Sequence, residues 1–149
     1  MIFVDAWAWL ALAYAKDPHH QTAVRLHSDF RKARRRYVTT DYVLSEVITY
    51  LFGVAPFQEA LTYTQQLLLS AEKGNVRLIY VSPQQFHNAW LHRQKLHDKP
   101  DISFVDLTSM AVMQDLAITD VFTGDAHFQQ VGLGFALHPG PSRQRGRAE

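Results

Sequence analysis

The sequence predicts an α/β domain with a central parallel sheet of four to five strands and helices on both faces. Short runs rich in apolar, β-branched and aromatic residues alternate with longer segments of helical periodicity. This alternation indicates a parallel sheet, because parallel neighbours need long crossover connections and these are usually helical. A chain of 149 residues is also the right length for one domain with a sizeable core.

Strands are expected where a short apolar run is bounded by turn or capping residues. Five segments fit this description: 2–4, 37–40, 76–81, 120–123 and an edge strand at 134–137. Helices are expected between them at 6–15, 21–33, 41–52, 57–73, 83–96, 103–116 and 126–130.

Local signals set the ends of several helices. Pro18 is expected to interrupt the helical pattern after the first helix. Asp41 is suited to cap the third helix, and Gly53 is expected to end it. Ser82, followed by Pro83 at the first helical position, opens the fifth helix with the spacing of a capping box.

The composition excludes several kinds of protein. It is 47% hydrophobic, 12% aromatic and 19% charged, which is typical of a soluble globular domain. The absence of cysteine rules out disulfide scaffolds, thiolate zinc sites and cysteine nucleophiles, and no pair of histidines has helical zinc-site spacing. The apolar run Ala6 to Ala15 is too short to cross a bilayer, so a cytoplasmic protein without membrane contact is expected.

Two acidic residues follow strands of the predicted sheet. Asp5 comes directly after the strand at 2–4, and Asp125 follows the strand at 120–123 after a single glycine. In open α/β sheets the working crevice lies beyond the carboxyl ends of the strands, where the strand order reverses. Asp5 lies between apolar segments, where an unpaired carboxylate is destabilised by the loss of its water.

Two further acids can reach the same edge. Glu46 lies among apolar neighbours on the helix at 41–52, and Asp106 lies in the first turn of the helix opened by Ser103. Helix capping is an alternative explanation for Asp5, Asp106 and Asp125 taken singly. Glu46 is too far into its helix to act as a cap, so the four acids together indicate a shared partner.

A divalent cation is the partner that this chemistry favours. Neighbouring carboxylates repel one another, and without a counter-charge some of them would take up protons. Oxygen ligands suit a hard ion such as Mg²⁺ or Mn²⁺. Such a site supports attack of a metal-activated water on a phosphodiester.

The ordered motifs resemble those of PIN-domain nucleases, and within them the VapC-like toxins of type II (VapBC) toxin-antitoxin systems. They are Val4-Asp5, Thr39-Thr40-x-x-Val43-Leu44-x-Glu46, Ser103-x-x-Asp106 and Thr123-x-Asp125-x-His127-Phe128. The resemblance covers 1–139 as a single PIN-like domain, and the basic tail 140–149 is expected to be disordered. One position departs from the family pattern: Ala6 stands where Thr or Ser is usual, so a hydroxyl beside Asp5 is absent.

The resemblance implies an endoribonuclease that hydrolyses RNA with the help of Mg²⁺ or Mn²⁺. The catalytic and metal-binding residues would be the four acids Asp5, Glu46, Asp106 and Asp125. Thr123 matches a hydroxyl residue that hydrogen-bonds within the acidic centre, and His127 would orient a phosphate or water, or serve local packing or capping. A homodimer and a small VapB-like antitoxin that covers the acidic groove are also implied.

Contact with RNA phosphates is expected from basic residues. The main cluster is Arg31, Lys32, Arg34, Arg35 and Arg36, with Arg93, Lys95 and Lys99 as weaker candidates. Arg143, Arg145 and Arg147 recur in the tail, and a solvated loop and a frayed terminus explain these clusters equally well. Asp101 and Asp120 are reserve candidates for the acidic cluster, although solvation is the favoured explanation for both. Trp7 and Trp9 are expected to belong to the core or to a dimer face.

Two classes of function other than a nuclease are compatible with a metal-binding α/β domain. A receiver domain needs an aspartate at the end of the third strand, where Val81-Ser82 stands, and an aspartyl phosphatase needs one at Trp7. Both therefore fail on sequence. A non-catalytic PIN-fold protein that binds RNA or acts as a scaffold remains an alternative.

Overall fold

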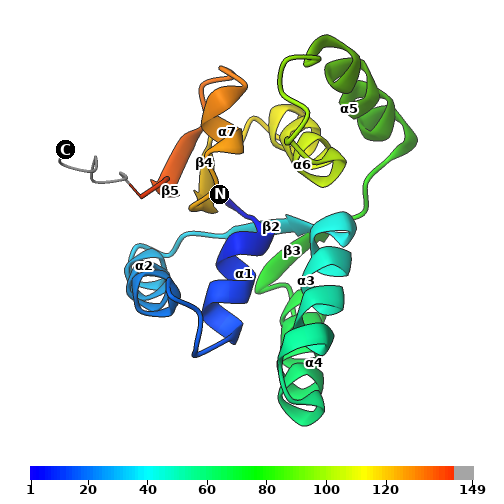
Figure 1. Cartoon of the computed structure of the whole chain (residues 1–149). Coiled ribbons are helices and arrows are strands. Elements are labelled where there is room, and N and C mark those ends of the chain that lie inside the picture. The colour runs from blue at the N-terminus through cyan, green and yellow to red at the C-terminus, as the bar shows by residue number, and fades with distance from the viewer. Residues whose placement is uncertain (143–149) are drawn as a thin grey trace, which may run out of the picture.

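A computed structural model describes residues 1–142 of the chain as a five-stranded parallel sheet with helices on both faces (Figure 1). The strands are β1 (Ile2–Val4), β2 (Tyr37–Thr40), β3 (Val76–Ile79), β4 (Asp120–Thr123) and β5 (Ala136–Pro139). The helices are α1 (Ala6–Ala13), α2 (His20–Lys32), α3 (Asp41–Val54), α4 (Phe57–Glu72), α5 (Pro83–Lys95), α6 (Phe104–Asp115) and α7 (His127–Gln130). The predicted fold class is confirmed, whereas the predicted disorder of the tail falls largely on residues 143–149, which lie outside the described part.

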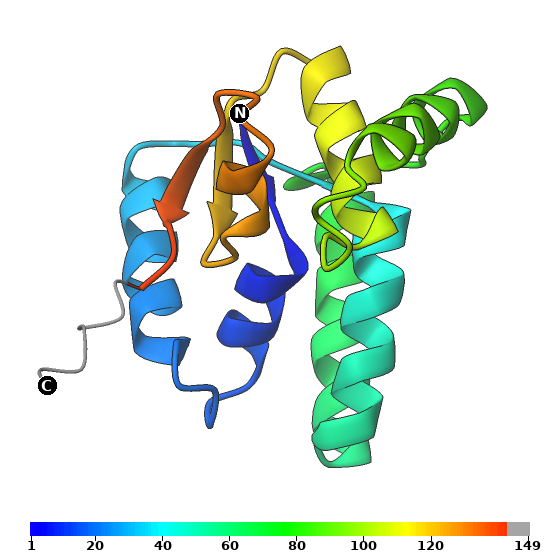
Figure 2. The same cartoon turned by 45° about the horizontal axis from the view of Figure 1, so that its top comes forward.

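The strand order β3-β2-β1-β4-β5 places the reversal of the sheet between β1 and β4. The chain runs outward from β1 through β2 to β3 and then returns to the other side of β1 with β4 and β5. Helices α1 to α4 lie on one face and α5 to α7 on the other (Figures 1 and 2). The carboxyl ends of β1 and β4 therefore meet at the switch point, where ligands bind in such sheets.

The central strands form the core of the domain. Ile2, Phe3 and Val4 of β1 and Val121 and Phe122 of β4 have no exposed surface. Parallel strands covered on both faces read as continuous apolar runs, because neither side faces water. The short apolar runs in the sequence were thus sufficient to locate these strands.

Two predicted capping roles were wrong. Thr40, not Asp41, caps α3 by accepting the Val43 N–H at 3.1 Å, while the Asp41 carboxylate accepts the Val81 N–H at 2.9 Å and ties α3 to the end of β3. Gly53 does not end α3, which continues to Val54. The stop comes instead from Pro56, which disfavours a helical conformation at the residue before it.

The edge strand also differs from the prediction in its position. β5 covers 136–139, two residues later than expected, because its register is set by pairing with β4. The capping box at Ser82 and Gln85 is present as predicted.

Candidate active site

Asp5 stands at the switch point and does not act as a helix cap. It occupies the position before α1, but its side chain makes no capping hydrogen bond. Its carboxylate Oδ2 instead accepts the Thr123 hydroxyl at 2.8 Å, across from the end of β4. Only 3% of Asp5 is exposed, so the simpler capping explanation for this residue is excluded.

Burial disfavours the ionised form of the Asp5 carboxyl group. The pKa of Asp5 is raised from 3.8 to about 7, mainly by the loss of water on burial and then by the charges of Asp106 and, more weakly, Asp125. The hydrogen bond from Thr123 and the backbone N–H of Ala6 oppose this rise. A carboxylate held in this state is stabilised by a bound cation, which favours its ionised form.

Thr123 connects the two acids that follow neighbouring strands. Its hydroxyl donates to Asp5 and accepts the Asp125 N–H at 3.0 Å. Thr123 is completely buried, so this pair of bonds fixes the turn after β4 relative to the end of β1. Asp5 is thus held by the hydroxyl of Thr123. A hydroxyl at position 6, where this chain has Ala6, is not the group that makes this bond.

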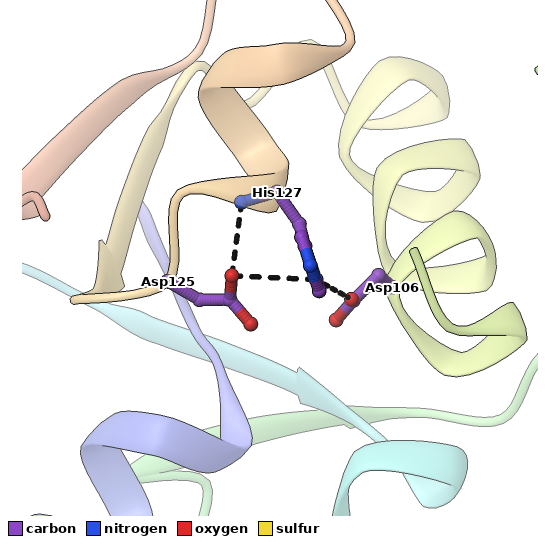
Figure 3. Close-up of side chains that lie close together, drawn as sticks. All are labelled: Asp106, Asp125 and His127. Carbon is purple, nitrogen blue, oxygen red and sulfur yellow. Dashed lines mark hydrogen bonds and ion pairs between the residues drawn. The ribbon is translucent and has the colours of Figure 1, made fainter. Parts of the chain in front are cut away.

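Asp106, Asp125 and His127 form a compact group beyond the carboxyl end of β4 (Figure 3). His127 Nδ1 lies 3.0 Å from Asp106 Oδ2 and 3.3 Å from Asp125 Oδ1. The backbone N–H of His127 donates to Asp125 Oδ1 at 2.9 Å. Both neighbours of Nδ1 are carboxylate oxygens, so this nitrogen carries the proton. A ring nitrogen of His127 and one carboxylate oxygen each from Asp106 and Asp125 lie within 4.8 Å of one another, so the two carboxylates are close enough to share a metal ion.

Asp106 is held in this group by the start of α6. Ser103 caps that helix by accepting the Asp106 N–H at 3.1 Å, and only 6% of Asp106 is exposed. Burial raises the pKa of Asp106, the nearby Asp125 charge adds to the rise, and the hydrogen bond from His127 partly offsets it. The Asp106 carboxylate is therefore directed toward His127 rather than serving as a reciprocal cap.

Glu46 lies at the rim of the group on α3. Its side chain is exposed, and it is not among the three residues whose ligand atoms meet. Partial burial raises the pKa of Glu46, followed by the charges of Asp106 and Asp125, so the three carboxyl groups influence one another. Glu46 is thus positioned to face a substrate more directly than the buried acids.

Three contacts that support the site, two made by Thr39 and one between Gly124 and Trp7, were missed by sequence reasoning. The Thr39 hydroxyl donates to the Val4 carbonyl at 3.0 Å, and Trp9 Nε1 donates to the Thr39 oxygen at 3.2 Å, which ties β2 and α1 to the residue before Asp5. Gly124 leaves room for Trp7, because a Cβ there would lie 2.4 Å from the indole ring. No local pattern in the sequence reveals any of these contacts.

The main basic cluster lies at the amino ends of the strands, the opposite end of the sheet from the acids. It occupies the end of α2 and the segment before β2, whereas the acids follow the carboxyl ends of the strands. Arg35 forms an ion pair of 2.7 Å with Asp120, which also lies 3.1 Å from His138 Nε2. Asp120 is therefore paired rather than simply solvated, while Asp101 is exposed as predicted.

The weaker basic candidates include one that is wrong. The guanidinium of Arg93 donates to three backbone carbonyl groups, those of Leu96, Lys99 and Ile102. It holds the loop between α5 and α6 and is not available to phosphates. Lys99 pairs with Asp98 at 2.8 Å on the surface.

Trp9 belongs to the core, with 5% of its surface exposed, and Trp7 is half-buried against Gly124 and the His19 ring.

Among residues 1–142, no helix is long and apolar enough to cross a membrane.

Comparisons with known proteins agree with this arrangement. Residues 2–133 match the PIN domain family. The 23S rRNA-specific endonuclease VapC20 of Mycobacterium tuberculosis, in strains CDC 1551 / Oshkosh and ATCC 25618 / H37Rv, is 33% identical over 133 residues, which cover 89% of this chain and 95% of VapC20. The crystal structure of VapC20, described as a sarcin-ricin loop cleaving toxin, has a TM-score of 0.74 and 32% identity, and covers the same shares of the two chains.

The buried charge at Asp5 predicts a pH dependence of stability in metal-free protein. Between about pH 4 and pH 7 the folded state keeps a proton that the unfolded chain has lost, so stability falls as the pH rises through this range. Asp5→Asn keeps an oxygen for Thr123 but removes the charge. We expect this variant to be more stable than wild type at pH 8, by at most a few kcal/mol, since each pKa unit corresponds to about 1.4 kcal/mol.

Urea unfolding in EDTA at pH 5 and pH 8 measures this effect. The advantage of Asp5→Asn should shrink at pH 5, where the wild-type carboxyl is already neutral. Equal pH slopes for the two proteins, or a less stable variant at pH 8, would show that Asp5 carries no such charge penalty.

Gly124→Ala is expected to destabilise the protein by about 1–3 kcal/mol, because the new methyl group overlaps the Trp7 indole. Urea unfolding of the single variants and of the double variant with Trp7→Ala tests the cause. The double variant should lose less stability than the sum of the two single losses, since the overlap is then removed. Additive losses would contradict a clash between these two residues.

Proposed function

Because the chain belongs to the PIN domain family, we propose that it is a metal-dependent endoribonuclease, a VapC-like toxin that hydrolyses RNA phosphodiester bonds. The observation that supports this most strongly is the group of Asp5, Asp106, Asp125 and His127 at the switch point of the sheet. Buried carboxyl groups at such a position are unfavourable without a charged ligand, and perturbed acids in a crevice are typical of functional sites.

The donor set fits a hard divalent cation. Asp106 and Asp125 supply carboxylate oxygens whose spacing suits one ion, and the raised pKa values of Asp5 and Asp106 favour the arrival of positive charge. In this proposal Asp5, Glu46, Asp106 and Asp125 hold Mg²⁺ or Mn²⁺. The ion would supply charge neutralisation and a water activated for attack on phosphorus.

The protein's own residues would prepare the site for that chemistry. Thr123 holds Asp5 and the backbone of Asp125 in register. His127, through its Nδ1 proton, holds the carboxylates of Asp106 and Asp125 in place and reduces their mutual repulsion. Glu46, exposed at the rim with a raised pKa, would complete the set of carboxylates from the solvent side.

The substrate we propose is RNA, and ribosomal RNA is the first to test. VapC20, which is 33% identical to this chain over 133 residues, is named as a 23S rRNA-specific endonuclease. Arg31, Lys32, Arg34 and Arg36 are exposed and would contact phosphates far from the scissile bond. A pocket of about 980 Å³ at the same edge, lined in part by Arg35, Arg36 and Arg77, supports phosphate binding there.

The partners follow from the same proposal. A VapB-like antitoxin would cover the acidic crevice, and a homodimer would be the working form in the cytoplasm. The alternative is a non-catalytic PIN-fold protein that binds RNA, and it predicts the same RNA contacts without cleavage.

Cleavage of ribosomal RNA and of a mixed RNA pool tests the proposal. Purified protein should cut RNA with Mg²⁺ or Mn²⁺ and not with EDTA. Asp5→Asn and Asp106→Asn should each lower the rate by at least about a hundredfold, because each removes a proposed metal ligand, whereas Asp101→Asn, an exposed acid outside the group, should cut like wild type. Folded wild-type protein that cuts nothing, or variants that cut as fast as wild type, would favour the non-catalytic alternative.

A further inference from the structure

A groove of about 690 Å³ adjoins the acidic site along α3. It is lined by the outward side of α3 from Asp41 to Tyr50 and by Val105 of α6, the residue before Asp106. Glu46 belongs both to this groove and to the set of interacting acids. The groove is therefore continuous with the proposed catalytic centre, and Figure 2 shows α6 lying across the start of α3.

Helical spacing places two aromatic rings along this groove. Tyr42, Glu46 and Tyr50 follow one another at intervals of four residues, so they share one side of α3 and are separated by about 6 Å along its axis. Half of Tyr50 is exposed, and Tyr42 is half-buried. A flat aromatic surface thus lies on either side of the acid at the rim.

The charges of the groove indicate which part of a nucleic acid it suits. No basic residue is among those that line it, and its two charged residues are the acids Asp41 and Glu46. Such a surface repels phosphates. It suits bases, which stack on aromatic rings and whose amino groups donate to carboxylates.

We propose that this groove is a base-binding subsite, in which an unpaired nucleotide next to the scissile phosphate stacks on Tyr50, with Tyr42 on the other side of Glu46. This inference rests on the proposed ribonuclease function and adds a source of substrate preference to it. Phosphates and bases would then be recognised at separate places, by the arginines at the far edge of the sheet and by α3. The subsite requires single-stranded or splayed RNA, because paired bases do not offer their faces.

Binding of short single-stranded RNA, measured by fluorescence anisotropy with Mg²⁺, tests the inference without cleavage. All variants are made in Asp106→Asn protein so that the RNA stays intact. Tyr50→Ala should weaken binding about tenfold, because one stacking surface is lost, and Tyr50→Phe should bind as tightly as the parent protein. Phe57→Ala is the matched control, since Phe57 is 69% exposed but lies outside the groove.

A substrate change identifies the base that occupies the groove. An abasic nucleotide is moved through the positions that flank the cleavage site. At one position it should weaken binding to the parent protein about tenfold and have no further effect on Tyr50→Ala, because the two changes remove the same contact. Independent, multiplicative effects at every position would overturn the inference.

The outcomes separate this inference from the proposed function. If wild-type protein cuts RNA but Tyr50→Ala binds it as tightly as the parent, the proposal of a base-binding subsite is wrong. A protein partner is then the occupant of the groove to test next. If wild-type protein cuts nothing, the ribonuclease proposal fails, and the binding comparison still decides whether Tyr50 contacts a base. Equal loss of RNA binding in Tyr50→Ala and in the control Phe57→Ala would likewise overturn the inference.

Discussion

The constraint on which this structure depends is the burial of the Asp5 carboxylate beside Asp106 and Asp125. Each additional negative charge raises the free energy of the others, so the metal-free crevice favours protonated carboxyl groups. The protein sets this arrangement at the one place where two neighbouring strands, β1 and β4, direct their carboxyl ends into a shared crevice. Positive charge is what this group of acids lacks, and in the proposed function a divalent cation would supply it.

The surrounding fold keeps these acids close despite their repulsion. Thr123 connects Asp5 to the turn after β4, and His127 lies between Asp106 and Asp125. On the other side of β1, Trp9 and Thr39 hold the strand end itself through the Val4 carbonyl. Chains of buried hydrogen bonds of this kind resist rearrangement, because breaking one leaves a buried polar group without a partner.

Sequence reasoning located the strands, most helices and the acids, because apolar runs and residues that follow strand ends have local signals. It expected four acids in one cluster, whereas Glu46 lies at the exposed rim and His127 lies between two carboxylates. It also did not place the arginine cluster, although residues that precede a strand lie at its amino end, away from Asp5. The contacts of Gly124 with Trp7 and of Asp120 with Arg35 join distant segments, and no local pattern predicts them.

Direct measurement of Mn²⁺ binding tests the central claim that these acids form a metal centre. Isothermal titration calorimetry at pH 7.5 compares wild type with Asp106→Asn and with Asp101→Asn, which lies outside the group. We expect saturable binding by wild type and Asp101→Asn and at least tenfold weaker binding by Asp106→Asn, which loses one of the carboxylates in the group. Absence of saturable binding by folded wild-type protein, or equal affinity in all three proteins, would contradict the account.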